Sequence, residues 1–270
     1  MAKVFCIDVA KCSGCYNCQL ACKEEHCTNE WLPIAAKQPM TGQFWLQVEE
    51  HVQGTKPKVK IHYIPVLCNH CSDPVCMKAA KDGAVYKRED GLVIIDPEKA
   101  KGQKEIAEAC PYGAVFWNEE LQIPQKCTGC AHLLAEGKMP RCVDVCHTGA
   151  IRFGEEEEFA EFIEGASVRQ PDDGQGPRVY YRNIPGRFIA GTVYDPEEEA
   201  VIRNARCCLK DGTETWVTES DFFGDFWFRD LPEGMFDLTI EAEGFETLLF
   251  TGIDTAENSI NLGDSPMKRK

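Results

Sequence analysis

The sequence predicts an α+β protein in two parts: short strands and helices around cysteine-rich loops, then a C-terminal all-β sandwich. The first observation is the cysteine distribution, because fourteen of the sixteen cysteines precede residue 147 and many stand three residues apart. The second is a change of composition near Phe188, after which short β-rich segments alternate with Gly and Asp. A length of 270 residues accommodates two modest domains of these kinds.

Composition and charge exclude several classes of protein. Hydrophobic residues make up 43% and charged residues 27% of the chain, a globular mixture that excludes global disorder. The 44 acidic residues outnumber the 29 basic ones, and the net charge of −15 argues against nucleic acid as a partner. The chain has no apolar run of about 18 residues, so we expect no membrane span. The first residues lack the apolar core of a secretory signal, and we expect a cytoplasmic protein.

Twelve cysteines fall into groups whose spacing is typical of iron–sulfur proteins. The first group, Cys12-x2-Cys15-x2-Cys18-x3-Cys22, has the spacing of bacterial ferredoxins, in which the fourth cysteine ligates the other cluster of a pair. The other eight are Cys68, Cys71 and Cys76, the single Cys110, and Cys127, Cys130, Cys142 and Cys146. Twelve thiolates suffice for three 4Fe-4S clusters. No chemistry is assigned to the four remaining cysteines, Cys6, Cys27, Cys207 and Cys208.

Zinc is the main alternative to iron for these groups. Twelve cysteines could fill three tetrahedral all-cysteine zinc sites and make the chain a non-redox scaffold. Zinc motifs, however, consist of cysteine pairs separated by a long gap, whereas Cys12, Cys15 and Cys18 supply three ligands in close succession. The spacing therefore favours iron–sulfur clusters. A brown colour that bleaches on reduction would distinguish the two.

Four expected ligands are missing, and their positions form a pattern. When the ferredoxin spacing is laid over the third motif with Cys110 as its fourth cysteine, the first three positions fall on Ala100, Gln103 and Ile106. The fourth position of the second motif falls on Ala80. In crossed ligation these four residues would have held one and the same cluster. The sequence therefore predicts that one whole cluster is absent, while its partner keeps the ligands Cys68, Cys71, Cys76 and Cys110.

The same crossing rule pairs the two outer motifs. It assigns one cluster to Cys12, Cys15, Cys18 and Cys146, and another to Cys127, Cys130, Cys142 and Cys22. The alternative is local ligation, in which Cys12, Cys15, Cys18 and Cys22 hold one cluster and the last motif holds the other. Lys11 and Lys126 each precede the first cysteine of an outer motif. A positive charge there would favour the reduced cluster, although a solvated lysine is an equal alternative.

The cysteine motifs resemble those of the iron–sulfur subunits of the dimethyl sulfoxide reductase superfamily of molybdenum and tungsten enzymes. The resemblance rests on Cys68-Asn-His-Cys-Ser-Asp-Pro-Val-Cys76, Asp90-Gly-Leu-Val-Ile-Ile-Asp96, Cys110-Pro-Tyr-Gly-Ala114 and Lys126-Cys-Thr-Gly-Cys130, and it covers residues 1 to about 185. Within that superfamily, the reduced third motif is most similar to small subunits of pyrogallol–phloroglucinol transhydroxylases, with catechol dehydroxylases as relatives. Lys23 and His147 depart from the pattern, because proline usually follows the fourth cysteine.

The resemblance implies an electron-transfer subunit without catalytic residues of its own. It implies two fused bacterial ferredoxin-like halves, and a large catalytic partner in which two molybdopterin guanine dinucleotides hold molybdenum or tungsten. The two chains would form a heterodimer or a multiple of it and act on polyhydroxylated aromatics, by transhydroxylation or catechol dehydroxylation. A polysulfide, formate or nitrate type of oxidoreductase stays open as the partner. So does export beside a partner that carries its own signal.

The expected domain bounds are 1–187 for the double-ferredoxin-like domain and 188–270 for the sandwich. The first includes an insertion at 29–64, whose aromatic residues pack under the clusters or, as we prefer, against a partner. It ends in an extension at 155–187, which begins with the acidic helix start Glu155–Glu158. We expect strands at Val4–Asp8 and Leu92–Ile95, a helix at Lys99–Ala109, and a loop at Arg169–Gly176. Residues 177–187 are expected to run back along the first domain as an extended segment.

The C-terminal segments predict a β-sandwich. Their β-rich stretches are Ile189–Tyr194, Ala205–Leu209, Thr215–Thr218, Asp225–Phe228 and Phe236–Glu241. The turn around Asp221–Gly224 and the run Leu231–Gly234 resemble carboxypeptidase-regulatory, prealbumin-like domains. This part has no constellation of metal ligands or nucleophiles, and we expect a packing or docking module.

Overall fold

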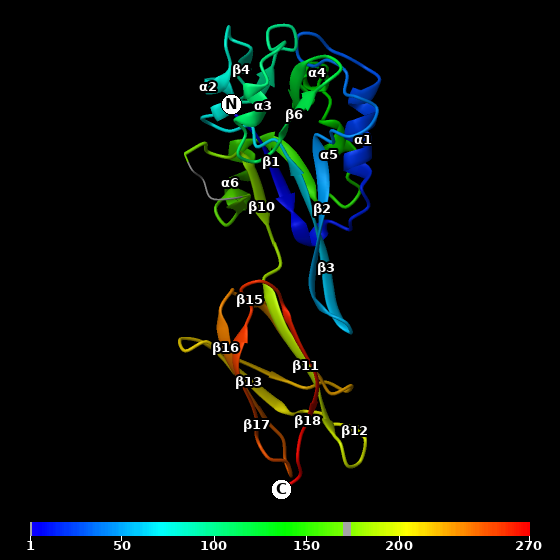
Figure 1. The fold of residues 1–270 in the computed structure, drawn as a ribbon, viewed down its shortest axis with the longest axis vertical. Helices are drawn as coiled ribbons and strands as arrows, with labels where there is room; N and C mark the ends of the chain where they lie inside the picture. Colours follow the sequence, from blue (N-terminus) through cyan, green and yellow to red (C-terminus); the bar gives the residue numbers. More distant parts are fainter. Residues whose placement is uncertain (1, 170–173) are drawn as a thin grey trace. The chain divides into compact units, whose positions relative to one another are not determined.

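The computed structural model describes residues 2–169 and 174–270, and its chain divides into two compact units (Figure 1). The first unit consists of Met1–Glu50 and His62–Ile184, and the second of His51–Ile61 and Pro185–Lys270. A β-hairpin of strands β2 (Leu46–Thr55) and β3 (Lys58–Leu67) is shared, because its base belongs to the first unit and its tip to the second. The fold class is the predicted α+β arrangement, a cysteine-rich part of short elements followed by a β-sandwich.

A four-stranded sheet organises the first unit around strand β1 (Lys3–Asp8). This strand pairs antiparallel with β8 (Ile151–Glu155) and parallel with β10 (Val179–Arg182), which in turn pairs antiparallel with β9 (Ser167–Val168). Its residues Val4 to Ile7 are all buried, as expected for a central strand covered on both faces. The predicted strand at Val4–Asp8 and the predicted return of the chain as an extended segment are both confirmed.

Short elements carry the cysteine loops. The helices are η1 (Val9–Lys11), α1 (Asn17–Cys27), α2 (Val75–Ala79), α3 (Glu105–Glu108), α4 (Ala131–Ala135) and α5 (Arg141–Asp144). Two hairpins lie between them, β4 (Val85–Lys87) with β5 (Val93–Ile95), and β6 (Val115–Asn118) with β7 (Ile123–Lys126). Later in the chain, η2 (Glu156–Phe159) and α6 (Ala160–Ile163) follow the sheet strand β8. The expected strand at Leu92–Ile95 is therefore present as β5.

Two local predictions for the first unit turn out differently. The helix expected over Lys99–Ala109 is wrong in its first half, because Gly102 has a φ of +80° and α3 begins only at Glu105. The acidic run does begin a helix, as expected, and Glu155 and Glu158 form a reciprocal capping box at the start of η2. The loop expected at Arg169–Gly176 lies partly outside the described residues.

Two cores lie beneath the cysteine loops. The larger contains Phe5, Trp45, Leu92 and Tyr181 together with five of the cysteines, Cys18, Cys22, Cys68, Cys127 and Cys142. Trp45 comes from the insertion and is 3% exposed. This aromatic side chain therefore packs under the cysteines, and it is not available on the surface for the preferred contact with a partner. The smaller core surrounds Ala100 and Ile106 beside the β4–β5 hairpin.

The second unit is a sandwich of two sheets, in which the described strand pairs are antiparallel except for β11 with β18. One sheet has the order β12-β11-β15, with β18 added to β11 in parallel, and its strands are β11 (Arg187–Asp195), β12 (Ala200–Val201), β15 (Asp225–Leu231) and β18 (Ile260–Pro266). The other has the order β14-β13-β16-β17, with β13 (Arg206–Lys210), β14 (Thr215–Glu219), β16 (Met235–Glu241) and β17 (Leu248–Asp254). Side chains from both sheets, including Phe226, Leu209 and Phe236, form one apolar core.

The hairpin tip is tied into the second unit by polar contacts. Lys58 is buried and its Nζ lies 2.6 Å from Asp225 Oδ1, while Ser259 Oγ lies 3.0 Å from Gln53 Oε1.

In the described part of the chain, no helix is long and apolar enough to cross a membrane.

Candidate metal centres

The sulfur atoms of the first group come from two segments of the first unit that are far apart in the sequence. This group comprises the three cysteines of the N-terminal loop and Cys146, which follows α5. Burial raises the pKa of Cys18 to about 12, and the neighbouring Cys12, Cys146 and Cys15 raise it further. The pKa of Cys12 is likewise raised by burial and by Cys146 and Cys15. The fold therefore brings the late Cys146 to the early loop.

The second group joins α1 to the last cysteine motif. Burial raises the pKa of Cys22 well above its usual value, and Cys127 and Cys130 add to that rise. The same holds for Cys142, which is influenced by Cys130, Cys127 and Cys22. All four side chains are buried, with exposures of 5–7%.

The third group lines a cavity of its own. Burial raises the pKa of Cys71 to about 12, and Cys68, Cys76 and Cys110 raise it further. The cavity has about 360 Å³ of empty space, its mouth included, and is lined by these four cysteines with apolar residues such as Val75, Val93 and Val115. The single Cys110 therefore completes a set of four with the second motif.

The second group lies between the other two. Cys18 of the first group is within electrostatic range of Cys22 and Cys142. Cys68 of the third group is within range of Cys127, whose pKa is raised to about 12 by burial and by that neighbour. The three groups thus follow one another in the order first, second, third.

The surroundings of the sulfurs fit a bound anionic cluster. Backbone N–H groups donate to cysteine Sγ atoms at 3.3–3.5 Å, in the pairs His70–Cys68, Gly129–Cys127, Arg141–Cys130 and Ile151–Cys146. Such donors stabilise thiolate ligands and modulate cluster potentials. Because burial keeps the free thiols protonated, binding of a cluster must release protons. Among residues 2–169 and 174–270, no three His, Cys, Asp or Glu side chains are arranged to hold a single metal ion.

The two lysines that precede the outer motifs differ in environment. Lys126 is 3% exposed, and its Nζ donates to the carbonyl oxygens of Val93 and, at 2.9 Å, Cys127. Its charge lowers the pKa of Cys76, which burial raises overall to about 11. Lys11 is exposed and lies 3.8 Å from Asp8. Lys126 is thus a buried cation beside the third group, whereas Lys11 matches the solvated alternative.

The two departures from the proline pattern have separate contacts. Lys23 is buried, and its Nζ donates to the carbonyl oxygens of Pro39 and, at 2.8 Å, Gly42, which ties the insertion to α1. His147 is exposed, and its Nδ1 lies 4.0 Å from Cys15 Sγ.

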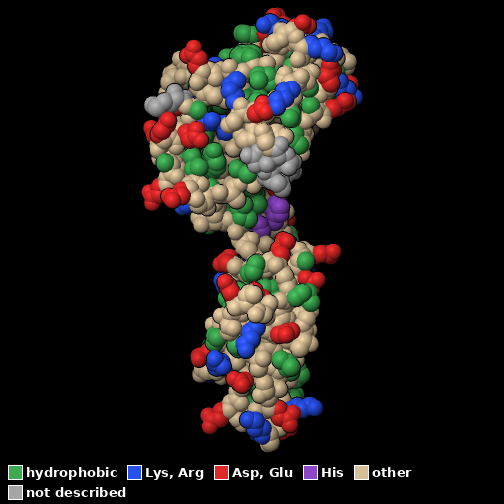
Figure 2. Space-filling view, turned by 90° about the vertical axis from the view of Figure 1, so that its left-hand side faces the viewer, with side chains coloured by type: hydrophobic (Ala, Val, Ile, Leu, Met, Phe, Trp, Pro, Cys, Tyr) green, Lys and Arg blue, Asp and Glu red, His purple; other side chains and the backbone are tan. Residues whose placement is uncertain are grey.

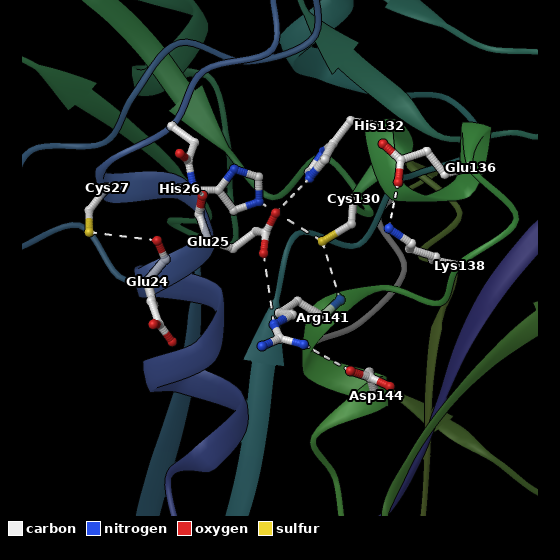
Figure 3. Close-up of polar contacts among 11 residues, drawn as sticks. Glu24, Glu25, His26, Cys27, Cys130, His132, Glu136, Lys138, Arg141 and Asp144 are labelled. Atoms are coloured by element: carbon white, nitrogen blue, oxygen red, sulfur yellow. Dashed lines mark hydrogen bonds and ion pairs between the residues drawn. The ribbon is translucent and has the colours of Figure 1, made fainter.

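A polar network beside Cys130 is absent from the sequence predictions (Figure 3). His26 Nε2 lies 3.9 Å from Cys130 Sγ, and His132 Nε2 lies 3.0 Å from Glu25 Oε1. The guanidinium of Arg141 lies 3.8 Å from the other carboxylate oxygen of Glu25. The available signal was helical spacing, because Cys18, Cys22 and His26 stand four residues apart and share one face of α1.

The four positions at which the ferredoxin spacing predicts missing ligands are occupied by residues in ordinary packing contacts. Ala100 and Ile106 are fully buried in the smaller core, and Ala80 packs against it. Gln103 accepts a hydrogen bond from the Lys81 N–H at 2.8 Å and donates to the carbonyl oxygens of Lys81 and Lys99 at 3.4 and 2.8 Å. In the described structure, these four residues make packing contacts and hydrogen bonds in one region of the first unit.

Comparisons with known families agree with this architecture. Residues 59–156 match the model of the 4Fe-4S dicluster domain. Residues 189–262 match the carboxypeptidase regulatory-like domain. Together these matches identify an iron–sulfur protein with an appended regulatory-type sandwich.

Relatives specify the class further. The chain is 40% identical to the pyrogallol hydroxytransferase small subunit of Pelobacter acidigallici, over 95% of this chain and 96% of that one. It is 32% identical to a chain of the tetrathionate reductase of Salmonella typhimurium, over 68% and 73% of the two chains. The arsenate respiratory reductase iron–sulfur subunit of Shewanella is 30% identical over 65% and 93%. The chain therefore belongs to the family of iron–sulfur electron-transfer subunits in the dimethyl sulfoxide reductase superfamily.

Proposed function

We propose that this chain carries three 4Fe-4S clusters and transfers electrons for a molybdopterin catalytic subunit that acts on polyhydroxylated aromatics. When bound, such a cluster supplies one-electron transfer without an open coordination site. The observation that carries the proposal is the gathering of twelve cysteines into three groups of four, each with mutual electrostatic influence. The partner would be a large subunit in a heterodimer or a multiple of it, with molybdenum or tungsten on two molybdopterin guanine dinucleotides.

Crossed ligation is part of the proposal. Cys146 would join the N-terminal loop, and Cys22 would join Cys127, Cys130 and Cys142. The neighbours of the two exchanged cysteines support this assignment. After burial, the largest contributions to the raised pKa of Cys22 come from Cys127 and Cys130. Cys146 contributes to the raised pKa values of Cys12 and Cys18. Local ligation would require Cys22 to turn from those neighbours toward the loop of Cys12.

The burial of the groups supports a relay with two accessible ends. Cys15 in the first group is exposed, and Cys71 and Cys110 in the third are half-buried, whereas the second group is buried throughout. An electron would then enter or leave at the first or third group, and the second would pass it between them. A buried middle site exchanges electrons with its neighbours instead of with solvent oxidants.

Single-cysteine variants test the ligands. In an anoxically purified complex we expect about twelve irons per chain. Cys22→Ser and Cys142→Ser should abolish the same electron paramagnetic resonance (EPR) signal, while Cys12→Ser abolishes another. If Cys22→Ser instead removes the signal lost in Cys12→Ser, local ligation is correct. Cys27→Ser is the matched control and should retain all signals. Zinc in place of iron would refute the cluster proposal.

The substrate class rests on the relative that matches almost the whole chain. Its name assigns a hydroxytransferase reaction on pyrogallol to that protein. Transhydroxylation consumes no net electrons, whereas catechol dehydroxylation requires two. The native complex should therefore be given pyrogallol without reductant, and a catechol with reduced viologen. Exchange of hydroxyl groups without reductant supports transhydroxylation, and viologen-dependent loss of a hydroxyl supports dehydroxylation. Turnover of neither, with turnover of tetrathionate or another inorganic acceptor, would assign the chain to a different oxidoreductase.

We also propose that the chain has two domains, 1–187 and 188–270, and that it is located in the cytoplasm. Limited proteolysis of the complex should cut near residue 187 if those bounds are correct. Cell fractionation with activity measurements tests the location.

A further inference from the structure

We infer that His26 is a positioning residue that sets the reduction potential of the cluster on the second cysteine group, by donating its Nε2–H to Cys130 Sγ. The inference rests on the proposed function, because it concerns a cluster held by Cys22, Cys127, Cys130 and Cys142. It adds a residue that the spacing of the cysteines alone does not assign to the relay.

The geometry of His26 specifies which nitrogen carries the proton. Nε2 lies 3.9 Å from Cys130 Sγ, and the side chain is 1% exposed. A thiolate that binds a metal has no proton, so the hydrogen bond across this contact requires Nε2 as the donor. The other ring nitrogen, Nδ1, has no hydrogen-bond partner within the described residues. A proton on Nδ1 would be a buried donor without an acceptor, so the proton of the imidazole belongs on Nε2, which faces Cys130 Sγ.

The ring is held in place from several sides. His26 follows Cys22 by one helical turn on the buried face of α1, so the helix that supplies a ligand also aims the donor. The rings of Trp31, Trp45 and His132 surround it, with centroid separations of 5.3, 4.7 and 5.5 Å. The carbonyl oxygen of His26 accepts a hydrogen bond from the Gln38 N–H at 2.7 Å, which anchors the insertion to the same turn.

Charges around Cys130 act in opposite directions. The Arg141 N–H donates to its Sγ at 3.4 Å, and the guanidinium adds a positive charge. The Glu25 carboxylate adds a negative charge near the same sulfur atom. Reduction makes a cluster more negative, so donors and cations favour it and carboxylates oppose it. Removing the His26 donor should therefore lower the potential, and neutralising Glu25 should raise it.

His147 provides a matched comparison at the first group. It contacts Cys15 Sγ through Nδ1 at 4.0 Å, but it is exposed. Water can replace a lost donor at an exposed site and cannot at a buried one. Replacing each histidine by the same residue should therefore change the potential of a different cluster. The change should be larger for His26 and the second group than for His147 and the first group.

The test is an EPR-monitored redox titration of the native complex with His26→Phe, His147→Phe and Glu25→Gln. Iron content and EPR spin integration come first, because they report whether three clusters are present at all and so test the proposed function separately. We expect His26→Phe to lower one midpoint potential, that of the signal lost in Cys142→Ser, and Glu25→Gln to raise it. His147→Phe should leave that potential unchanged, and His26→Gln, which retains an N–H donor, should recover part of the decrease.

A pulsed EPR measurement covers the case in which His26→Phe loses its cluster. In the wild-type complex labelled with ¹⁵N-histidine, the signal assigned to the second group should show coupling to an imidazole nitrogen. Absence of that coupling overturns the inference. An unchanged potential in an iron-replete His26→Phe complex overturns it as well.

Discussion

Gly14 and Gly129, 115 residues apart, adopt the same left-handed backbone, with φ of +66° and +62°. Each stands immediately before the second cysteine of a C-x2-C pair, in the loops of Cys12 and Cys127. A Cβ at Gly14 would lie 2.5 Å from the Tyr63 ring, and one at Gly129 would lie 2.8 Å from Leu92 Cδ1. The two outer loops therefore share a turn that a side chain would both strain and overfill.

Gly129→Ala should consequently lose iron from the second group. The new methyl group needs a positive φ and displaces Leu92, a fully buried core residue, so we expect about four fewer irons per chain. Gly137→Ala is the matched control, because its φ is +73° but a Cβ there meets open space. Iron analysis after anoxic purification compares the two. Equal iron loss in both variants would mean that backbone strain alone is responsible.

Gln103→Leu should destabilise the first unit without changing its iron content. The substitution keeps the volume but leaves the Lys81 N–H and the carbonyl oxygens of Lys81 and Lys99 without this partner. These hydrogen bonds are partly buried, and each contributes about 0.5–1.5 kcal/mol to stability. Urea unfolding measures the free energy, with Gln122→Leu at an exposed glutamine as the control. A loss of iron with unchanged stability would contradict a purely structural role.

Breaking the buried ion pair at the hairpin tip should destabilise the second unit. Asp225→Asn removes the carboxylate 2.6 Å from Lys58, which is 6% exposed, and we expect a loss of about 2–3 kcal/mol. Adding Lys58→Met to that variant should restore most of the loss, because no buried charge then remains. Glu241→Gln, which breaks the exposed pair with Arg206, should change stability by less than about 0.5 kcal/mol. Equal losses of stability in the two single variants would contradict the prediction that the buried ion pair contributes more than the exposed one.

Stability at high pH should depend on Cys207. This thiol is fully buried in the sandwich, and desolvation raises its pKa from 9.0 to about 12. Because the unfolded thiol ionises first, its contribution is constant below about pH 9 and is lost as pH rises toward 12. The slope is at most about 1.4 kcal/mol per pH unit. Urea unfolding of wild type and Cys207→Ala between pH 8 and about pH 10.5 should show a steeper decline in the wild type. Parallel curves would show that Cys207 does not titrate there.

Local patterns in the sequence were sufficient for several features. The central strand could be predicted because Val4 to Ile7 form a continuous apolar run, and the cluster type could be predicted because ferredoxin spacing is specific. The ligand assignments built on that spacing stay a prediction. A regular helix could not be excluded at Lys99–Ala109, because the good helix formers there conceal the effect of one glycine.

Contacts between distant segments could not be predicted in the same way. His26 and Cys130 are 104 residues apart, and Glu25 and His132 are 107 apart. Lys11 and Lys126 have the same sequence context, but only the second is covered by neighbouring chain. Figure 2 shows how charged side chains are spread over one face of the molecule, and Lys126 differs from such surface lysines by its burial. Tertiary packing, which the local sequence does not encode, decides each of these cases.

The pairing of β1 has a consequence for biosynthesis. Its neighbours in the sheet are residues 151–155 and 179–182, so a nascent chain cannot complete this sheet until the ribosome has made about two thirds of the protein. Cys146 also emerges late. Under the proposed crossed ligation, the cluster of the early cysteine loop can be completed only after Cys146 has been synthesised.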